Sequence, residues 1–311
     1  MSVKMCVDSN HGTQPSFYAV NAFNKWLGCS FVLLMFAVGM ILAPAAASAG
    51  ESTISAKQRQ LLASRQAPIE VIRDQHGDAL RTINGAFTST NWSGYVLPKF
   101  ETGETYTSAQ ATWQVPQVTW DGAPSISANW VGIGGFCKND NCQKVDNSLI
   151  QLGTAQESLE PGETDYFAWY EMLPKASFMT TLTVNPGDVI TASLNCAGKC
   201  KGTQHWTLSM TDENSGLSWN HEFKYSSSKL SAEWIEEAPS TSNGIAPLAD
   251  FGTTSFVASM VDGGSANLSA GDSIEMNDPN GQLSSVSAPD STMDGFSACF
   301  DTPNCSFVPL L

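Results

Sequence analysis

Short segments in which apolar and polar side chains alternate dominate the chain from Thr88 onward. The clearest covers residues 105–115 and stops at Pro116. Further segments cover 166–172, 178–184, 189–194, 206–211 and 217–225, and turn sequences such as Asn185-Pro186-Gly187-Asp188 and Asp278-Pro279-Asn280-Gly281 separate strands. Helical periodicity is almost absent, so the pattern predicts one all-β domain at 88–311. Its expected fold is a two-sheet antiparallel β-sandwich of the concanavalin-like jelly-roll kind.

The N-terminus has the pattern of an export signal. Lys4 and Lys25 precede an apolar run at 31–42, and small residues follow up to Gly50. We therefore predict a signal peptide at 1–49, a secreted, extracellular product, and no membrane attachment after cleavage. An uncleaved anchor is the alternative, and a lipoprotein at Cys29 fits less well because that cysteine precedes the apolar run.

Charge separates the next segment from the domain. Five basic residues lie between Lys57 and Arg81, and 56–65 is typical of a short basic helix. After Arg81 there is no arginine, and only eight lysines face 25 acidic residues. The contrast predicts a propeptide at 50–87 that is held on the domain by charge, inhibits it, and loosens when carboxylates take up protons. A disordered linker is the alternative.

The acidic surface also limits the possible partners. It repels nucleic acid and anionic membranes. Self-repulsion fades at about pH 3 to 4 because many carboxylates are protonated there. The composition therefore favours an acid-adapted protein.

Six cysteines remain after the predicted signal cleavage, in three pairs that are close in sequence. Export makes local disulfides the expectation, although spacing alone does not fix the pairing. Zinc binding is the alternative, but protons compete for thiolates in acid. The candidates are Cys137, Cys142, Cys196, Cys200, Cys299 and Cys305.

Familiar hydrolase motifs are missing. His205 and His221 are the only histidines of the predicted domain and belong to no metal motif, and there is no G-x-S-x-G sequence and no pair of D-[ST]-G sequences. A histidine base is protonated in acid. A hydrolase built from these residues must therefore use Asp or Glu, and no cofactor or metal is expected.

Two polar residues interrupt apolar segments and need an explanation. Gln151 lies within 149–154, and Glu233 lies beside Trp234 within 231–237. Buried, each must find a partner or bear the cost of desolvation. A satisfied core amide and a solvated carboxylate are the structural alternatives.

A series of short motifs resembles the glutamic peptidase family, the eqolisins. In order along the chain, the motifs are Asn91-Trp92-Ser93-Gly94-Tyr95, Trp113-Gln114-Val115-Pro116, Asn129-Trp130-Val131-Gly132-Ile133, Leu149-Ile150-Gln151-Leu152-Gly153, Ala168-Trp169-Tyr170-Glu171 and Ala232-Glu233-Trp234-Ile235. The resemblance implies a catalytic dyad of Gln151 and Glu233. It also implies that Trp130, Glu171, Trp92 and Tyr170 are cleft or supporting residues. Gly134 and Phe167 depart from the pattern, because the family often has aspartates there.

The resemblance implies a mechanism without covalent intermediate or cofactor. Glu233 would activate water as a general base, and Gln151 would donate an amide N–H to the oxyanion. The expected partners are protein or peptide substrates and the chain's own propeptide, and the expected state is a monomer. Two alternatives remain: a lectin-like sandwich that binds sugars through exposed Trp92, Trp113 and Trp120, and a glycoside hydrolase that pairs Glu233 with Glu171.

Overall fold

The computed structural model describes residues 67–241, 243–279 and 281–310. The predicted signal peptide at 1–49 and basic helix at 56–65 lie outside the described residues.

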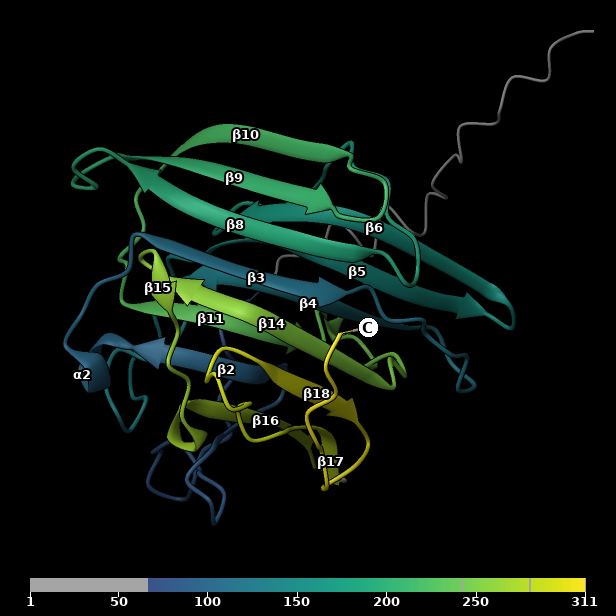
Figure 1. Cartoon of the computed structure of the whole chain (residues 1–311). Helices are drawn as coiled ribbons and strands as arrows, with labels where there is room; N and C mark the ends of the chain where they lie inside the picture. Colours follow the sequence, from purple (N-terminus) through teal and green to yellow (C-terminus); the bar gives the residue numbers. More distant parts are fainter. Residues whose placement is uncertain (1–66, 242, 280, 311) are drawn as a thin grey trace, which may run out of the picture. The chain divides into compact units, whose positions relative to one another are not determined.

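The strands form one hydrogen-bonded path that folds into two packed layers (Figure 1). The first layer runs in the order β10 (Ser218–Tyr225), β9 (Gln204–Asp212), β8 (Val189–Ala197), β3 (Ser108–Gln114), β14 (Thr253–Val261), β18 (Phe296–Phe300) and β17 (Gly281–Val286). The second runs in the order β16 (Ser273–Asp278), β2 (Trp92–Pro98), β11 (Ser231–Glu237), β4 (Ser125–Ile133), β5 (Ile150–Glu160), β6 (Glu163–Met172) and β7 (Phe178–Met179). Strands β3 and β8 pack on β4 and β5, which confirms the predicted β-sandwich.

The remaining elements are short. The hairpin strands β12 (Ser240–Thr241) and β13 (Gly244–Ile245) pair with each other, and β15 (Gly264–Ser265) folds back on β14. A single helical turn, α2 (Lys99–Thr102), follows β2, and a 3-10 turn, η1 (Ala270–Asp272), precedes β16. Strand β1 (Phe87–Ser89) pairs parallel to β16, so the sheet is not purely antiparallel.

Indole side chains hold the two layers together. Trp234 of β11 donates to the backbone carbonyl of Gln110 in β3 over 2.8 Å. Trp113 of β3 donates to the hydroxyl of Thr154 in β5 over 2.9 Å. Both indoles are completely buried, so each N–H needs a partner in the opposite layer.

The sandwich closes differently along its two sides. On one side the hairpin β16–β17 carries the ladder from one layer into the other. On the other side, Tyr170 of β6 stacks on Trp219 of β10 with ring centroids 5.3 Å apart and contacts Phe223 at 4.7 Å. This second side is therefore joined by side chains.

Several sequence-based expectations need correction. The segment 178–184 pairs only at Phe178–Met179, after which Leu182 and Val184 turn into the core without a ladder. Trp92 and Trp113 are buried and Trp120 is half-buried, so the exposed tryptophans of the lectin alternative are absent. Cysteines pair as Cys137–Cys142, Cys196–Cys200 and Cys299–Cys305, which confirms the predicted local disulfides.

The described part of the predicted propeptide packs on the domain. Isolated bridges join Val71 to Ser89 and Arg81 to Phe87, and β1 itself crosses the predicted boundary at 87. Ile69 and Phe87 are buried. The guanidinium of Arg81 lies over the Phe87 ring and pairs with Asp140 at 2.5 Å.

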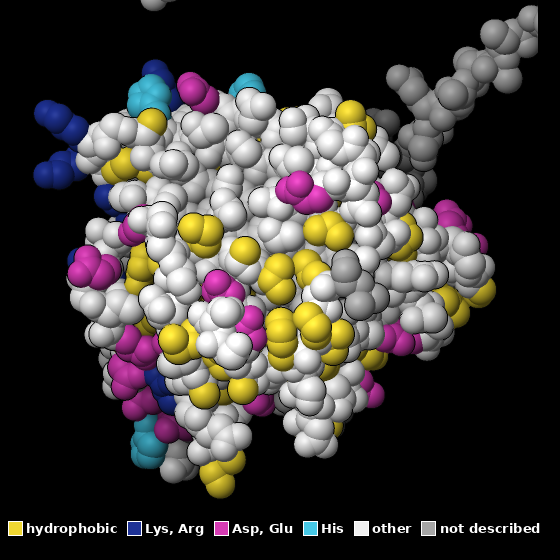
Figure 2. Space-filling model, in the orientation of Figure 1, with side chains coloured by type: hydrophobic (Ala, Val, Ile, Leu, Met, Phe, Trp, Pro, Cys, Tyr) yellow, Lys and Arg dark blue, Asp and Glu magenta, His cyan; other side chains and the backbone are white. Residues whose placement is uncertain are grey.

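The face shown in Figure 2 carries scattered acidic side chains, whereas most of its basic side chains gather at the upper left. This distribution agrees with the acidic composition of the domain. No helix within the described residues is long and apolar enough to span a membrane.

Candidate active site

The two predicted dyad residues lie in one row across the second layer. The register places Glu233 of β11 opposite Gly132 of β4, Gly132 opposite Gln151 of β5, and Gln151 opposite Glu171 of β6. Directly opposed residues project to the same face of a sheet. Neighbouring strands are about 4.8 Å apart, so the α-carbons of Glu233 and Gln151 are separated by ~10 Å, which two long side chains can bridge.

Gly132 lies between them in the row and has no side chain of its own. A Cβ atom there would lie 2.8 Å from Cζ3 of the Trp130 ring and 3.2 Å from Cβ of Gln151. The missing side chain thus lets the indole of Trp130 lie over the strand beside the dyad. This is a steric requirement for glycine, because its neighbours are packed too closely for any side chain.

Gln151 is oriented by a carboxylate. Its Nε2 donates to Oε2 of Glu171 over 2.8 Å, and both side chains are fully buried. The Oε1 atom of Gln151 has no hydrogen-bond partner among the described residues. Because the amide oxygen is not a donor, this bond assigns the nitrogen end of the Gln151 amide to the side that faces Glu171.

Glu233 is buried without any hydrogen bond of ordinary geometry to its carboxylate oxygens from the described residues. Burial raises the pKa of this carboxyl well above its usual range, and the nearby charge of Asp146 adds to the rise. The hydroxyl of Ser231 and the backbone N–H of Gly134 act in the opposite direction and lower the pKa. In this closed form, burial therefore favours the protonated form of Glu233.

Aromatic side chains surround the row on the same face. The Nε1 atom of Trp130 donates to Oε2 of Glu237 over 2.7 Å, and Trp130 meets the ring of Trp92 edge-on at 4.9 Å. Tyr170 alone among the predicted cleft residues is not brought to this place. It projects to the opposite face and stacks on Phe178 and Trp219.

Comparison with known proteins identifies the family. The model of the Peptidase A4 family matches residues 90–294, which include the whole row. The chain belongs to the Peptidase A4 family. Aspergillopepsin-2 from Aspergillus niger is 27% identical over an alignment of 214 residues that covers 60% of this chain and 70% of that protein. The chain is thus a glutamic endopeptidase, as the resemblance predicted.

Solved structures agree with the fold. Scytalido-glutamic peptidase with a peptide-based transition state analog superimposes with a TM-score of 0.53 at 23% identity, covering 68% of this chain and 98% of the other. SCP-B, an eqolisin solved with the tripeptide Ala-Ile-His, gives a TM-score of 0.50 at 23% identity over the same shares. At this level of identity the likeness concerns the β-sandwich.

The spacing of Glu233 and Glu171 in this row does not suit the glycoside hydrolase alternative. Glu233 and Glu171 are three strand steps apart, so their α-carbons are separated by ~14 Å. Glu171 is also engaged by the Gln151 amide, which lies between the two carboxyl groups. Paired carboxylates of glycosidases face a common sugar bond instead.

The two departures from the family pattern have structural explanations. Gly134 has a φ of +88°, and a Cβ atom there would lie 1.8 Å from the carbonyl oxygen of Ser148. An aspartate therefore cannot occupy this position. Phe167 is buried in the apolar cluster of the dyad face, where an aspartate would lack a polar environment.

The dyad face of the peptidase is closed. The apolar cluster that contains Trp130 also includes Ile69 and Phe87 from the predicted propeptide. It further includes Phe136 and Leu149 from the loop between β4 and β5. Glu233 and Gln151 consequently have no exposed surface.

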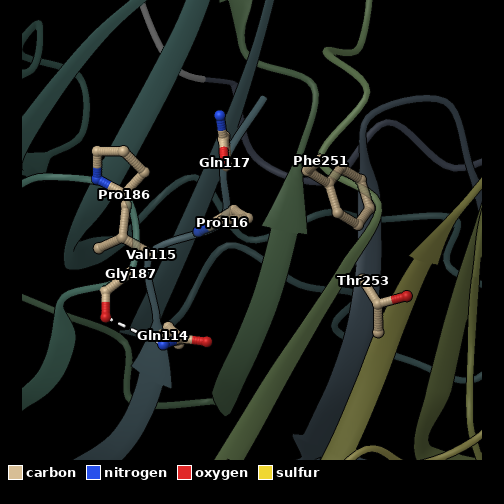
Figure 3. Close-up of a pocket in the computed structure, with 8 residues that line it drawn as sticks. All are labelled: Gln114, Val115, Pro116, Gln117, Pro186, Gly187, Phe251 and Thr253. Atoms are coloured by element: carbon tan, nitrogen blue, oxygen red, sulfur yellow. Dashed lines mark hydrogen bonds between the residues drawn. The ribbon is translucent and has the colours of Figure 1, made fainter. Parts of the chain in front are cut away.

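An open pocket of about 360 Å³ lies elsewhere, at the end of β3 (Figure 3). Pro116, Pro186 and Phe251 line it, and the Gln114 amide donates to the carbonyl of Gly187 at its rim. Its lining contains no titratable side chain, so it offers no acid–base chemistry. Within the described residues, no group of three His, Cys, Asp or Glu side chains is arranged to hold a metal ion.

Proposed function

We propose that Glu233 and Gln151 are the catalytic dyad of a secreted endopeptidase that works in acid. The observation that carries the proposal is the row itself, in which a carboxyl and an amide flank the one position that has no side chain. A water and a scissile carbonyl would bind between the carboxyl of Glu233 and the amide of Gln151.

The chemistry follows from the two functional groups. Ionised Glu233 takes a proton from the water as it attacks the carbonyl carbon. The amide N–H of Gln151 that is not bonded to Glu171 donates to the developing oxyanion, and an amide keeps this ability at every pH. Protonated Glu233 then delivers its proton to the leaving amine, so no covalent intermediate forms. Glu171 serves as a positioning residue because it fixes the amide of Gln151.

Replacing each dyad residue tests the proposal. E233Q should lower kcat/KM for an unfolded protein substrate at acidic pH by about 10⁴-fold, and Q151A by about 10²- to 10³-fold. Gln156→Ala is the control, because Gln156 is a buried amide of β5 on the opposite face. Wild-type proteolysis by folded E233Q or Q151A would refute the dyad.

The segment before Thr88 is proposed to act as an inhibitory propeptide. Its residue Ile69 belongs to the apolar cluster on the dyad face, and Arg81 pairs with Asp140 and, at 3.7 Å, with Glu101. Burial is the largest cause of the raised pKa of Glu101, so acidification protonates this partner early and weakens the ion pair. Departure of the segment would expose Glu233, reduce its desolvation, and allow it to ionise in acid.

The processing site is proposed to be the turn 82–85, where Ile83 is fully exposed at 102%. Exposed loop tips are preferred sites of proteolysis. A shift from pH 7 to pH 4 should produce a shorter chain whose N-terminus lies in this turn, as read by N-terminal sequencing. Retention of 67–81 in fully active protein would contradict the inhibitory role.

Secretion through the signal peptide at 1–49 and a monomeric state complete the proposal. The acidic, disulfide-bonded domain supports export to an oxidising compartment. Mass analysis of culture medium and light scattering of the purified protein test these two points.

A further inference from the structure

Asp146 is a buried carboxylate that no sequence motif singled out. It lies in the loop between β4 and β5 and is only 2% exposed. The loop is closed by the disulfide Cys137–Cys142 and by a backbone bond from the Asp146 N–H to the carbonyl of Phe136. The loop therefore holds Asp146 at the end of the strands that carry the dyad.

The contacts of Asp146 reach all three of those strands. The backbone N–H and hydroxyl of Ser148, which lies two residues before β5, donate to it over 3.2 Å. The hydroxyl of Ser228, in the segment that leads into β11, donates to its Oδ2 atom. Gly134 follows β4, and its Cβ position lies 3.3 Å from the same Oδ2 atom. One carboxylate thus connects the approaches to Gln151 and Glu233 by hydrogen bonds and lies beside the end of β4.

The position of Oδ2 has chemical meaning. Gly134 cannot carry a side chain, since the Ser148 carbonyl occupies the space. Asp146 nevertheless brings a carboxylate to the place that a short side chain at 134 would reach. The chain therefore supplies from a loop the negative charge that it cannot supply from the strand end.

Charged and titratable groups near Asp146 and Glu233 include Glu171 of the same row, which accepts the Gln151 amide, and three groups on other segments. Lys138 faces Asp146, with Nζ 3.6 Å from Oδ1. Burial raises the pKa of Tyr225 and of Tyr106. The charge of Asp146 adds to the rise for Tyr225, and the charge of Glu233 adds to the rise for Tyr106. Burial raises the pKa of Glu233, and the negative charge of Asp146 adds to that rise.

We propose that Asp146 is a positioning residue of the dyad, which braces the segments that lead into β5 and β11 and sets, through its negative charge, the pH range in which Glu233 works. This inference rests on the proposed function of Glu233. It assigns to Asp146 two separable contributions, one geometric and one electrostatic.

Two substitutions of Asp146 separate these contributions in the acid-activated protein. D146N keeps an acceptor oxygen but removes the charge, so Glu233 should lose its proton more easily. The acid limb of the kcat/KM–pH profile should then move to lower pH by ~0.5 to 1 unit. D146A also removes the brace and should lower kcat by about 10- to 100-fold with a smaller change in KM.

Asp212 provides a matched control. It is buried to a similar degree, 3% exposed, and accepts bonds from Asn214 and Ser215 in the β9–β10 turn, outside the dyad row. D212N should leave the pH profile in place even if it lowers the melting temperature. Lys138→Met gives a test that leaves the brace intact: loss of a cation should move the acid limb slightly upward.

The outcomes are distinct. A wild-type pH profile in D146N and in Lys138→Met would overturn the electrostatic assignment, and wild-type kcat in D146A would overturn the brace. If D146N does not fold, the direction of the Lys138→Met shift decides the electrostatic assignment. Failure of the proposed function itself would be recognised separately, because E233Q would then retain activity.

Discussion

Strand β11 carries three buried glutamates that face opposite sides of its sheet. Glu236 points between the layers, where the amide of Asn129 donates to it and Gln156 in turn donates to Asn129 over 2.9 Å. Glu233 points to the other face, beside Gly132, and its oxygens have no hydrogen-bond partner among the described residues. Burial raises the pKa of both carboxyl groups. Desolvation alone therefore does not distinguish the proposed catalytic carboxyl. The two glutamates differ because Glu236 accepts a hydrogen bond from Asn129, whereas Glu233 lies beside Gly132 without a hydrogen-bond partner among the described residues.

The sharpest way to break this comparison is to neutralise each glutamate in turn. E233Q should lower kcat/KM about 10⁴-fold. E236Q should change kcat/KM less than about threefold, because Glu236 points between the layers, away from the face that carries Glu233. Assays with acid-activated protein at one pH would measure both. Equal losses in the two variants would show that the faces do not differ in function.

Adding a side chain at Gly132 should have the next largest effect. The Cβ of G132A would meet the Trp130 ring at 2.8 Å and Gln151 at 3.2 Å, so both must shift. We expect a loss of about 10²-fold in kcat/KM and about 1 to 3 kcal/mol of stability. Gly162→Ala is the control for a glycine substitution, since no atom lies within 4 Å of its Cβ position. Its positive φ confines its effect to backbone strain at an exposed turn.

Removing the acceptor that holds Trp130 should have a smaller effect. E237L leaves the indole N–H unpaired, so the ring should lose its fixed orientation over Gly132 and kcat/KM should fall about 10-fold. E237Q retains an acceptor and should restore most of the activity. E236L, which disrupts the opposite face, should lower the melting temperature without this loss of activity.

The last prediction concerns stability and pH. Raised pKa values of Glu233, Glu236 and Glu237 mean that the folded state keeps protons which the unfolded state has released. Their contribution is complete below about pH 4.5 and is lost as the pH rises toward the folded-state pKa, by up to ~1.4 kcal/mol per unit and per group. Denaturant unfolding of the E233Q protein at pH 4 and pH 7 should therefore show higher stability at pH 4. Adding E236Q should reduce that difference, and an unchanged difference would contradict it.

The sequence predicted the strands best where one face is solvated. Alternation in β3 and β9 reports a buried and a more exposed side, β10 carries only half-buried and exposed residues, and the structure confirms all three strands. Strands β4 and β11 are buried on both faces, so periodicity could not say which of their residues share a side. Motif resemblance located Gln151 and Glu233, but only the register shows that Gly132 separates them.

Other parts of the site could not be predicted from the sequence, for physical reasons. Asp146 acts through loop geometry, and its contacts with Ser228 join positions 82 residues apart. Tyr170 belongs to the same motif as Glu171, yet adjacent strand residues point to opposite faces, and resemblance alone did not separate them. The packing of Ile69 and Phe87 on the dyad face was also hidden, because their partners lie far away in the sequence.

The disulfide Cys137–Cys142 has a consequence for how the site is assembled. It closes a five-residue step within the loop that presents Asp146. A cross-link of this kind removes conformational freedom from the unfolded chain, so less entropy is lost when the loop takes its final shape. Oxidation thus preorganises one corner of the active site before any substrate arrives.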